Sequence, residues 1–158
     1  MTLETISYRD GDAALSGLLA RPQGPARAAV VVLPTIMNAN APMERRARML
    51  ADAGFLAFVA DFYGEPVRDF EHSGELAKAL RADVDVYRAR IGAALAALRA
   101  HPEAAGLPLA AVGYCMGGQA ALEAARAGED IVLAASFHGL LATARPADKP
   151  IGARILVC

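Results

Sequence analysis

The chain has 158 residues, of which 55% are hydrophobic, and its 16 Lys and Arg against 17 Asp and Glu give a formal net charge of −1. A chain of this size and apolar content can bury one substantial core, so we expect a single domain over residues 1–158. The balanced charge gives no broad basic surface, which argues against nucleic acid or acidic lipid as a partner. A small, neutral or mildly polar substrate is more consistent with this charge balance.

The start of the chain carries neither the basic segment nor the apolar segment of a signal peptide. No apolar run reaches the length of a membrane span, so we expect a cytoplasmic protein with no membrane contact. The two cysteines, Cys115 and Cys158, are too few for a disulfide framework and lack the paired spacing of a zinc site. The role expected of each cysteine therefore depends on its surroundings.

The first predicted elements are an antiparallel hairpin and a buried strand. Residues 3–20 contain two short strands around Asp10-Gly11, a dipeptide typical of tight hairpin turns. The β-branched run at 28–33 then predicts a strand buried on both faces, and Pro34 ends it.

Helices and strands alternate after this point. We expect an amphipathic helix from Pro42 to Gly54, a long helix from about Leu76 to about Ala100, and another from about Met116 to Ala127. Buried strands are expected at 55–60, 109–112, 131–135 and 155–158, and the stretch 144–150 reads as a surface connection. This alternation predicts an α/β fold, a mostly parallel sheet with helices on both faces.

Cys115 lies between glycines, directly after one predicted strand and before a predicted helix, which is the arrangement of a nucleophile elbow. Gly113 and Gly117 fit this interpretation because a tight turn brings backbone against the nucleophile, where a β-carbon would collide. Gly118 gives room for close packing of helix and strand. The positive end of the helix favours the reactive thiolate. The alternative interpretation is a buried core cysteine beside a helix-entry turn.

The loop 33–38 after the first buried strand is the second candidate element. In a hydrolase of this topology the loop supplies one amide of the oxyanion hole, and the residue after the nucleophile supplies the other. By position these amides belong to Ile36 and Met116. The alternative is an ordinary strand-to-helix connection in which Pro34 is a stop signal.

Together these residues resemble the dienelactone hydrolase family. The matching stretches are Val30 to Met37, Gly54 to Gly64 with its Asp-Phe-Tyr-Gly motif, Gly113-Tyr114-Cys115-Met116-Gly117-Gly118, and Ser136 to Gly139. The resemblance implies an α/β-hydrolase fold and a Cys-His-Asp triad that hydrolyses esters or lactones without a metal. It also implies that Cys115 is the nucleophile and that Ile36 and Met116 give the oxyanion amides.

The chain departs from the family pattern in two ways. Studied members carry a glutamate where this chain has Thr35, and a neutral hydroxyl cannot take a proton from the resting cysteine as a carboxylate would. In the family the triad acid and histidine follow the nucleophile, whereas this chain ends at Cys158, in a predicted strand that precedes both. We therefore expect the domain to be incomplete at its C-terminus, with the last strand and helix missing.

The histidines present are not expected to replace the missing base, and a catalytic role of His138 is the alternative. His138 follows the strand after the elbow helix, where a rim or packing role fits its place in the chain, and His72 and His101 read as surface residues. Asp61 follows a strand at a Tyr-Gly turn, where a capping carboxylate is expected. Cys158 is expected to be a buried strand residue.

The sequence thus predicts a hydrolase that forms an acyl-enzyme on Cys115 from a small ester or lactone and needs no cofactor. One alternative is an inactive hydrolase-like remnant or binding protein, because no triad acid or base is visible. A second is a thiol redox sensor in which Cys158 would resolve an oxidised Cys115.

Overall fold

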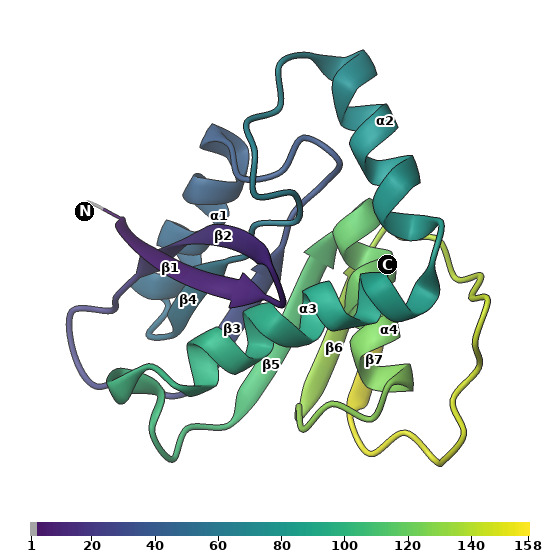
Figure 1. Cartoon of the computed structure of the whole chain (residues 1–158). Coiled ribbons are helices and arrows are strands. Elements are labelled where there is room, and N and C mark those ends of the chain that lie inside the picture. Colours follow the sequence, from purple (N-terminus) through teal and green to yellow (C-terminus); the bar gives the residue numbers. More distant parts are fainter. Residues whose placement is uncertain (1–2) are drawn as a thin grey trace.

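The seven strands of the computed structural model, which describes residues 3–158, form a mixed sheet in the order β1-β2-β4-β3-β5-β6-β7 (Figure 1). β1 pairs antiparallel with β2, and β2 pairs antiparallel with β4, whereas all other neighbours are parallel. The predicted mostly parallel sheet with an N-terminal hairpin is confirmed. The strands are β1 (Glu4–Asp10), β2 (Ala13–Ala20), β3 (Ala29–Leu33), β4 (Leu56–Val59), β5 (Leu109–Tyr114), β6 (Leu133–Phe137) and β7 (Arg154–Val157).

Helices cover both faces of this sheet. Met43 and Ala47 of α1 pack on one face together with Val32, whereas Val31 of the same strand faces the opposite side. That opposite side holds the larger core, which α3 and α4 cover with residues such as Leu95. Adjacent residues of a strand point to opposite faces, so a central strand covered on both sides reads as a continuous apolar run. The helices are α1 (Ala41–Asp52), α2 (Phe70–Arg81), α3 (Val84–Arg99) and α4 (Met116–Arg126), with a 3₁₀ turn at Pro102–Ala104.

The expected single helix over 76–100 is wrong, because two helices occupy this region. α2 begins at Phe70 and ends at Arg81, and the Asp83 carboxylate accepts hydrogen bonds from the amides of Asp85 (2.8 Å) and Val86 (3.4 Å). An aspartate in this position caps the start of a new helix and has extended backbone, which breaks the helical path. α2 consequently rises above the end of the sheet where β5 and β6 finish (Figure 1).

The last strand forms, but the expectation that it is buried is wrong. β7 pairs with β6 in parallel, and Ile155, Leu156 and Val157 are 44%, 46% and 48% exposed. Cys158 is exposed as well. β7 is the outermost strand of the described sheet, so one edge and much of its side-chain surface meet solvent. The apolar run predicts the strand correctly. Its burial, however, depends on which elements pack against it, and the sequence pattern does not specify these.

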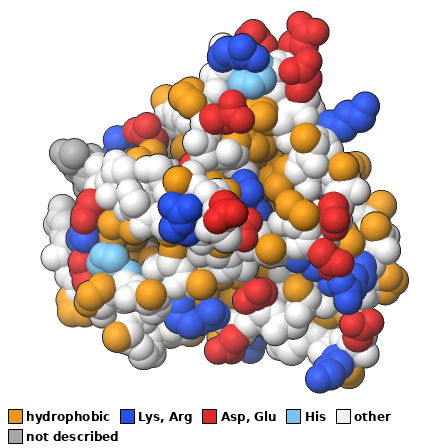
Figure 2. Space-filling view, in the orientation of Figure 1, with side chains coloured by type: hydrophobic (Ala, Val, Ile, Leu, Met, Phe, Trp, Pro, Cys, Tyr) orange, Lys and Arg blue, Asp and Glu red, His pale blue; other side chains and the backbone are white. Residues whose placement is uncertain are grey.

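The molecular surface mixes charges of both signs. Figure 2 shows basic and acidic side chains interspersed with hydrophobic ones on the visible face, with charged and histidine side chains at the protruding end of α2. The connection 144–150 is exposed over most of its length, as predicted. Among the helices of residues 3–158, none is both long enough and apolar enough to cross a membrane.

Candidate active site

Cys115 occupies a sharp turn between β5 and α4. Its backbone has φ 56° and ψ −117°, and it is one of three non-glycine residues with positive φ in the described chain. The Cys115 amide donates to the Phe137 carbonyl at 2.9 Å, and the Cys115 carbonyl accepts from the amides of Gly118 (2.9 Å) and Gln119 (3.2 Å). Such a conformation costs about 1–3 kcal/mol and persists only where the surroundings fix it. Here hydrogen bonds hold the residue on both sides.

Glycine is required on both sides of this turn for steric reasons. A β-carbon on Gly113 would lie 1.7 Å from the carbonyl oxygen of Gly117, and one on Gly117 would lie 2.0 Å from the carbonyl oxygen of Leu33. A β-carbon on Gly118 would lie 2.7 Å from Ser136 Oγ. Since real β-carbons essentially never approach other atoms closer than 3.0 Å, the start of α4 is pressed against the end of β3.

The loop after β3 lies beside this turn. The Asn38 amide donates to the Thr35 carbonyl at 3.0 Å, and the Met37 amide donates to Thr35 Oγ1 at 3.2 Å. The Thr35 hydroxyl therefore stabilises the conformation of its own loop. Tyr63 Oη donates to the Ile36 carbonyl at 3.0 Å and lies 3.8 Å from Met116 Sδ. A single tyrosine hydroxyl thus contacts both residues that the sequence proposes for the oxyanion hole.

The amides of Ile36 and Met116 carry no hydrogen bond to another group within residues 3–158. Met116 is the first residue of α4, where an amide has no partner inside its helix. Two unengaged backbone amides near a strained cysteine can donate hydrogen bonds to an external oxygen that carries negative charge.

Asp61 organises the turn that carries Tyr63. Its Oδ1 accepts from Asn38 Nδ2 (2.8 Å) and from the amides of Tyr63 and Gly64 (3.0 Å each). Its Oδ2 accepts from the Ser16 amide at 3.0 Å. Asp61 is therefore the turn-capping carboxylate that the sequence predicts. Sequence reasoning missed the roles of Asn38 and Tyr63, although the Asp-Phe-Tyr-Gly motif was the available signal.

Two tyrosine hydroxyls lie in the electrostatic field of Cys115. Burial raises the pKa of Tyr63 to about 12, with Arg81 opposing the shift and negative charge on Cys115 adding to it. Burial also raises the pKa of Tyr87 above its ordinary value, with Arg81 again opposing and Cys115 again adding. Tyr87 Oη donates to the Met116 carbonyl at 2.8 Å. Both hydroxyls consequently remain protonated hydrogen-bond donors at neutral pH.

The three histidines have different surroundings. His138 follows β6 with φ 44° and is exposed, and its amide donates to the Cys158 carbonyl at 2.8 Å. His101 caps the 3₁₀ turn. His72 was expected on the surface but is 9% exposed, and its Nδ1 accepts from the amide and Nε of Arg68 at 3.3 Å each. That expectation was wrong because Arg68, in the loop that precedes α2, contacts the imidazole.

Cys158 is not placed to form a disulfide with Cys115. Both are free thiols, and Cys158 ends β7, which is separated from β5 by β6. Two strand spacings correspond to roughly 9–10 Å between α-carbons, whereas a disulfide spans at most about 7 Å. This distance argues against the redox alternative in which Cys158 resolves an oxidised Cys115.

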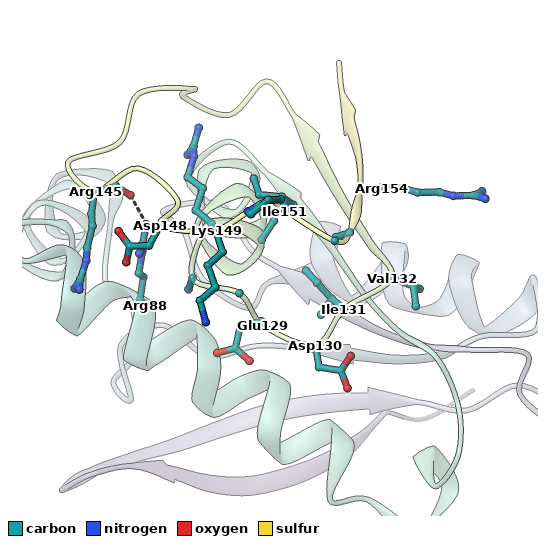
Figure 3. Close-up of a pocket in the computed structure, with 17 residues that line it drawn as sticks. Arg88, Glu129, Asp130, Ile131, Val132, Arg145, Asp148, Lys149, Ile151 and Arg154 are labelled. Carbon is teal, nitrogen blue, oxygen red and sulfur yellow. Dashed lines mark hydrogen bonds between the residues drawn. The ribbon is translucent and has the colours of Figure 1, made fainter.

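A large hollow lies at the other end of the sheet. It has a volume of about 940 Å³, and Ile131 and Arg154, at the amino ends of β6 and β7, line it together with charged residues such as Lys149 and Glu129 (Figure 3). Cys115 follows the carboxyl end of β5, so this hollow is not the candidate site. In parallel α/β sheets, ligands bind outside the carboxyl ends of the strands.

A buried ion pair lies beside this hollow. Glu123 is 1% exposed, and its carboxylate contacts the guanidinium groups of Arg88 at 2.8 Å and Arg126 at 2.9 Å. Arg88 also donates to the Arg145 carbonyl (Figure 3), and Arg126 donates to the Leu141 carbonyl. The two arginines therefore attach the connection between β6 and β7 to α3 and α4.

The strand order, the helices on both faces and the turn at Cys115 define an α/β-hydrolase fold. The family model of the dienelactone hydrolase family matches residues 15–157. The chain therefore belongs to the dienelactone hydrolase family.

Solved structures agree with this assignment. The protein m3DLH is 35% identical with a TM-score of 0.88, and the match covers 99% of this chain and 68% of that one. A dienelactone hydrolase-like promiscuous phosphotriesterase from metagenomic libraries is 30% identical with a TM-score of 0.86, covering 99% and 81%. A dienelactone hydrolase from Anabaena variabilis is 25% identical with a TM-score of 0.68, covering 87% and 63%. A comparison with curated proteins gave no match.

Proposed function

We propose that Cys115 is the nucleophile of an ester or lactone hydrolase and that the amides of Ile36 and Met116 form its oxyanion hole. The observation that carries this proposal is the strained turn at Cys115 beside two unengaged backbone donors. The shape of the turn, the required glycines and membership of the family support it.

The chemistry follows from this geometry. The Cys115 thiolate attacks the carbonyl carbon, the π electrons move to oxygen, and the two amides stabilise the resulting oxyanion. Collapse expels the alkoxide, which takes a proton from solvent or an acid, and leaves a thioester on Cys115. Hydrolysis of the thioester needs a general base, and no histidine within residues 3–158 forms a hydrogen bond with Cys115. We therefore assign acylation to these residues, and we propose that the triad acid and histidine follow Cys158.

A labelling experiment tests the proposal. The chain is incubated with p-nitrophenyl acetate, the release of p-nitrophenolate is followed, and the acetylated peptide is located by mass spectrometry. We expect one acetyl group on Cys115 in the wild type and in Cys158→Ala, and none at this site in Cys115→Ala. Cys158→Ala is the matched control because it removes the other free thiol, which is exposed. A folded chain that acquires label on Cys158 but not on Cys115 would contradict the proposal.

The second candidate function is an inactive, hydrolase-like binding protein. The absence of a hydrogen-bonded base beside Cys115 within residues 3–158 favours it. Multiple-turnover measurements distinguish the two: catalysis that exceeds one equivalent and disappears in Cys115→Ala excludes the inactive protein. Because one relative is described as a promiscuous phosphotriesterase, a phosphotriester is a useful second electrophile in the same assay.

A further inference from the structure

We propose that Tyr63 and Tyr87 are positioning residues that hold the two oxyanion amides at their working separation. This inference rests on the proposed function of Cys115. It assigns to each tyrosine hydroxyl one backbone carbonyl, that of Ile36 or that of Met116, and neither tyrosine needs to touch the substrate.

Tyr63 fixes the loop side of the hole. The Ile36 amide belongs to a peptide whose carbonyl, on Thr35, already accepts from the Asn38 amide at 3.0 Å. Tyr63 Oη holds the other side of Ile36 by donating to its carbonyl at 3.0 Å. With both flanking carbonyls engaged, rotation of the Ile36 amide away from the site would break a hydrogen bond.

Tyr87 fixes the helix side in the same way. The Met116 amide belongs to a peptide whose carbonyl, on Cys115, accepts from the amides of Gly118 and Gln119. Tyr87 Oη donates to the Met116 carbonyl at 2.8 Å, and the Tyr87 side chain is 3% exposed. The hydroxyl thus reaches the first residue of α4 from α3 and ties the turn to a second helix.

Tyr63 and Tyr87 are linked through Met116 and Phe62. Tyr63 Oη lies 3.8 Å from Met116 Sδ while it holds Ile36, so this side chain spans the gap between the loop and the helix. The rings of Phe62 and Tyr87 pack with centroids 6.1 Å apart, and those of Phe62 and Tyr63 with centroids 6.3 Å apart. One aromatic cluster therefore sets the distance between the two donors.

The separation of the two amides matters because a donor stabilises the oxyanion only within a narrow range of donor–oxygen distances. Stabilisation requires donors about 2.7–3.1 Å from the developing oxyanion, and loss of one such donor lowers the rate by about 10²–10³-fold. Loss of an anchoring hydrogen bond loosens a donor without removing it, so its effect is smaller.

The test compares two reactions of the same thiol. Acetylation by p-nitrophenyl acetate passes through an oxyanion, whereas alkylation by iodoacetamide displaces iodide at a saturated carbon and forms no oxyanion. We expect Tyr63→Phe to lower the acetylation rate of Cys115 by about threefold to tenfold and to leave the alkylation rate within about twofold of the wild type. Tyr87→Phe shifts the same ratio in the same direction but less, because the Met116 carbonyl also accepts within its helix.

Tyr114→Phe is the matched control. This residue precedes Cys115, stacks on Phe137 with centroids 5.1 Å apart, and its hydroxyl makes no hydrogen bond within the described chain. We expect its ratio of acetylation to alkylation to equal that of the wild type.

The possible results distinguish the positioning role of Tyr63 from the nucleophilic role of Cys115. Equal acetylation rates in Tyr63→Phe, Tyr114→Phe and the wild type would overturn the positioning role while leaving Cys115 as nucleophile. An equal fall in both reactions of Tyr63→Phe would also overturn it, because the tyrosine would then act on the thiol or on the fold. A wild type that is alkylated at Cys115 but not acetylated would refute the proposed function and this inference with it.

Discussion

Replacing Gly117 with alanine should damage both the fold and the candidate site. The added β-carbon would lie 2.0 Å from the carbonyl oxygen of Leu33 and 2.5 Å from that of Pro34, and both are backbone atoms that no rotamer change can move. Restoring ordinary contact requires the start of α4 and the end of β3 to separate by more than about 1 Å. Overpacking of this kind costs about 1–3 kcal/mol and sometimes more, and we expect the upper end because backbone must move.

The magnitude is measurable by thermal and urea unfolding. A loss of about 3 kcal/mol corresponds to a fall in Tm of roughly 6–12 °C for a chain of this length. The same separation moves the Ile36 amide away from the Met116 amide, so acetylation of Cys115 should fall more than alkylation does.

The matched control is Gly74→Ala on α2. Apart from its chain neighbours and the backbone of α2, no described atom lies within 4 Å of the position that its β-carbon would take. Alanine is favoured over glycine inside a helix by about 0.5–1 kcal/mol, so this variant should be slightly more stable than the wild type. If Gly117→Ala unfolds at the same temperature as the wild type, the tight contact between β3 and α4 does not exist in solution and the argument fails.

Three further predictions concern other parts of the fold. Asp83→Ala removes the cap of α3 and should lower the free energy of unfolding by about 1 kcal/mol, which an unchanged urea midpoint would contradict. Glu123→Leu leaves two partly buried arginines without their carboxylate and should cost about 3–5 kcal/mol, whereas a stability loss below about 1 kcal/mol would show that the pair is dispensable. Burial raises the pKa values of Tyr8, Tyr63 and Tyr87 above the ordinary 10.0, so the unfolded chain ionises first. The stability that depends on these groups is present in full below about pH 10 and falls as pH rises further, and a flat urea midpoint from pH 9 to about 11 would refute this.

Local sequence signals predicted most of the fold because they reflect local physics. The Asp-Gly turn, the β-branched run of β3 and the glycines around Cys115 each act through neighbouring backbone, and the structure shows each of them. The break between α2 and α3 also has a local signal, because Asp83 is a strong capping residue. The apolar periodicity on both sides of Asp83 nevertheless led to the prediction of one continuous helix.

The parts that could not be predicted depend on long-range contacts. The exposure of β7 is set by its place at the edge of the sheet, and the anchoring of Ile36 by Tyr63 joins residues 27 positions apart. Tyr87 and Met116 are 29 positions apart. No periodicity or spacing rule specifies which tyrosine hydroxyl meets which carbonyl. That residues 1–158 form one domain and that Cys115 reacts both stay predictions.

The hairpin of β1 and β2 has a consequence for protein engineering. Tyr8 Oη contacts both the carbonyl and the amide of Asp61, and the Ser16 amide holds the carboxylate of Asp61, which in turn holds Asn38 and the loop of Ile36. The hairpin therefore supports the loop 33–38, although it lies at the opposite end of the sheet order from β6 and β7. Libraries that vary only residues near Cys115 would omit this support. We expect beneficial variants in a directed-evolution screen to include substitutions at the hairpin.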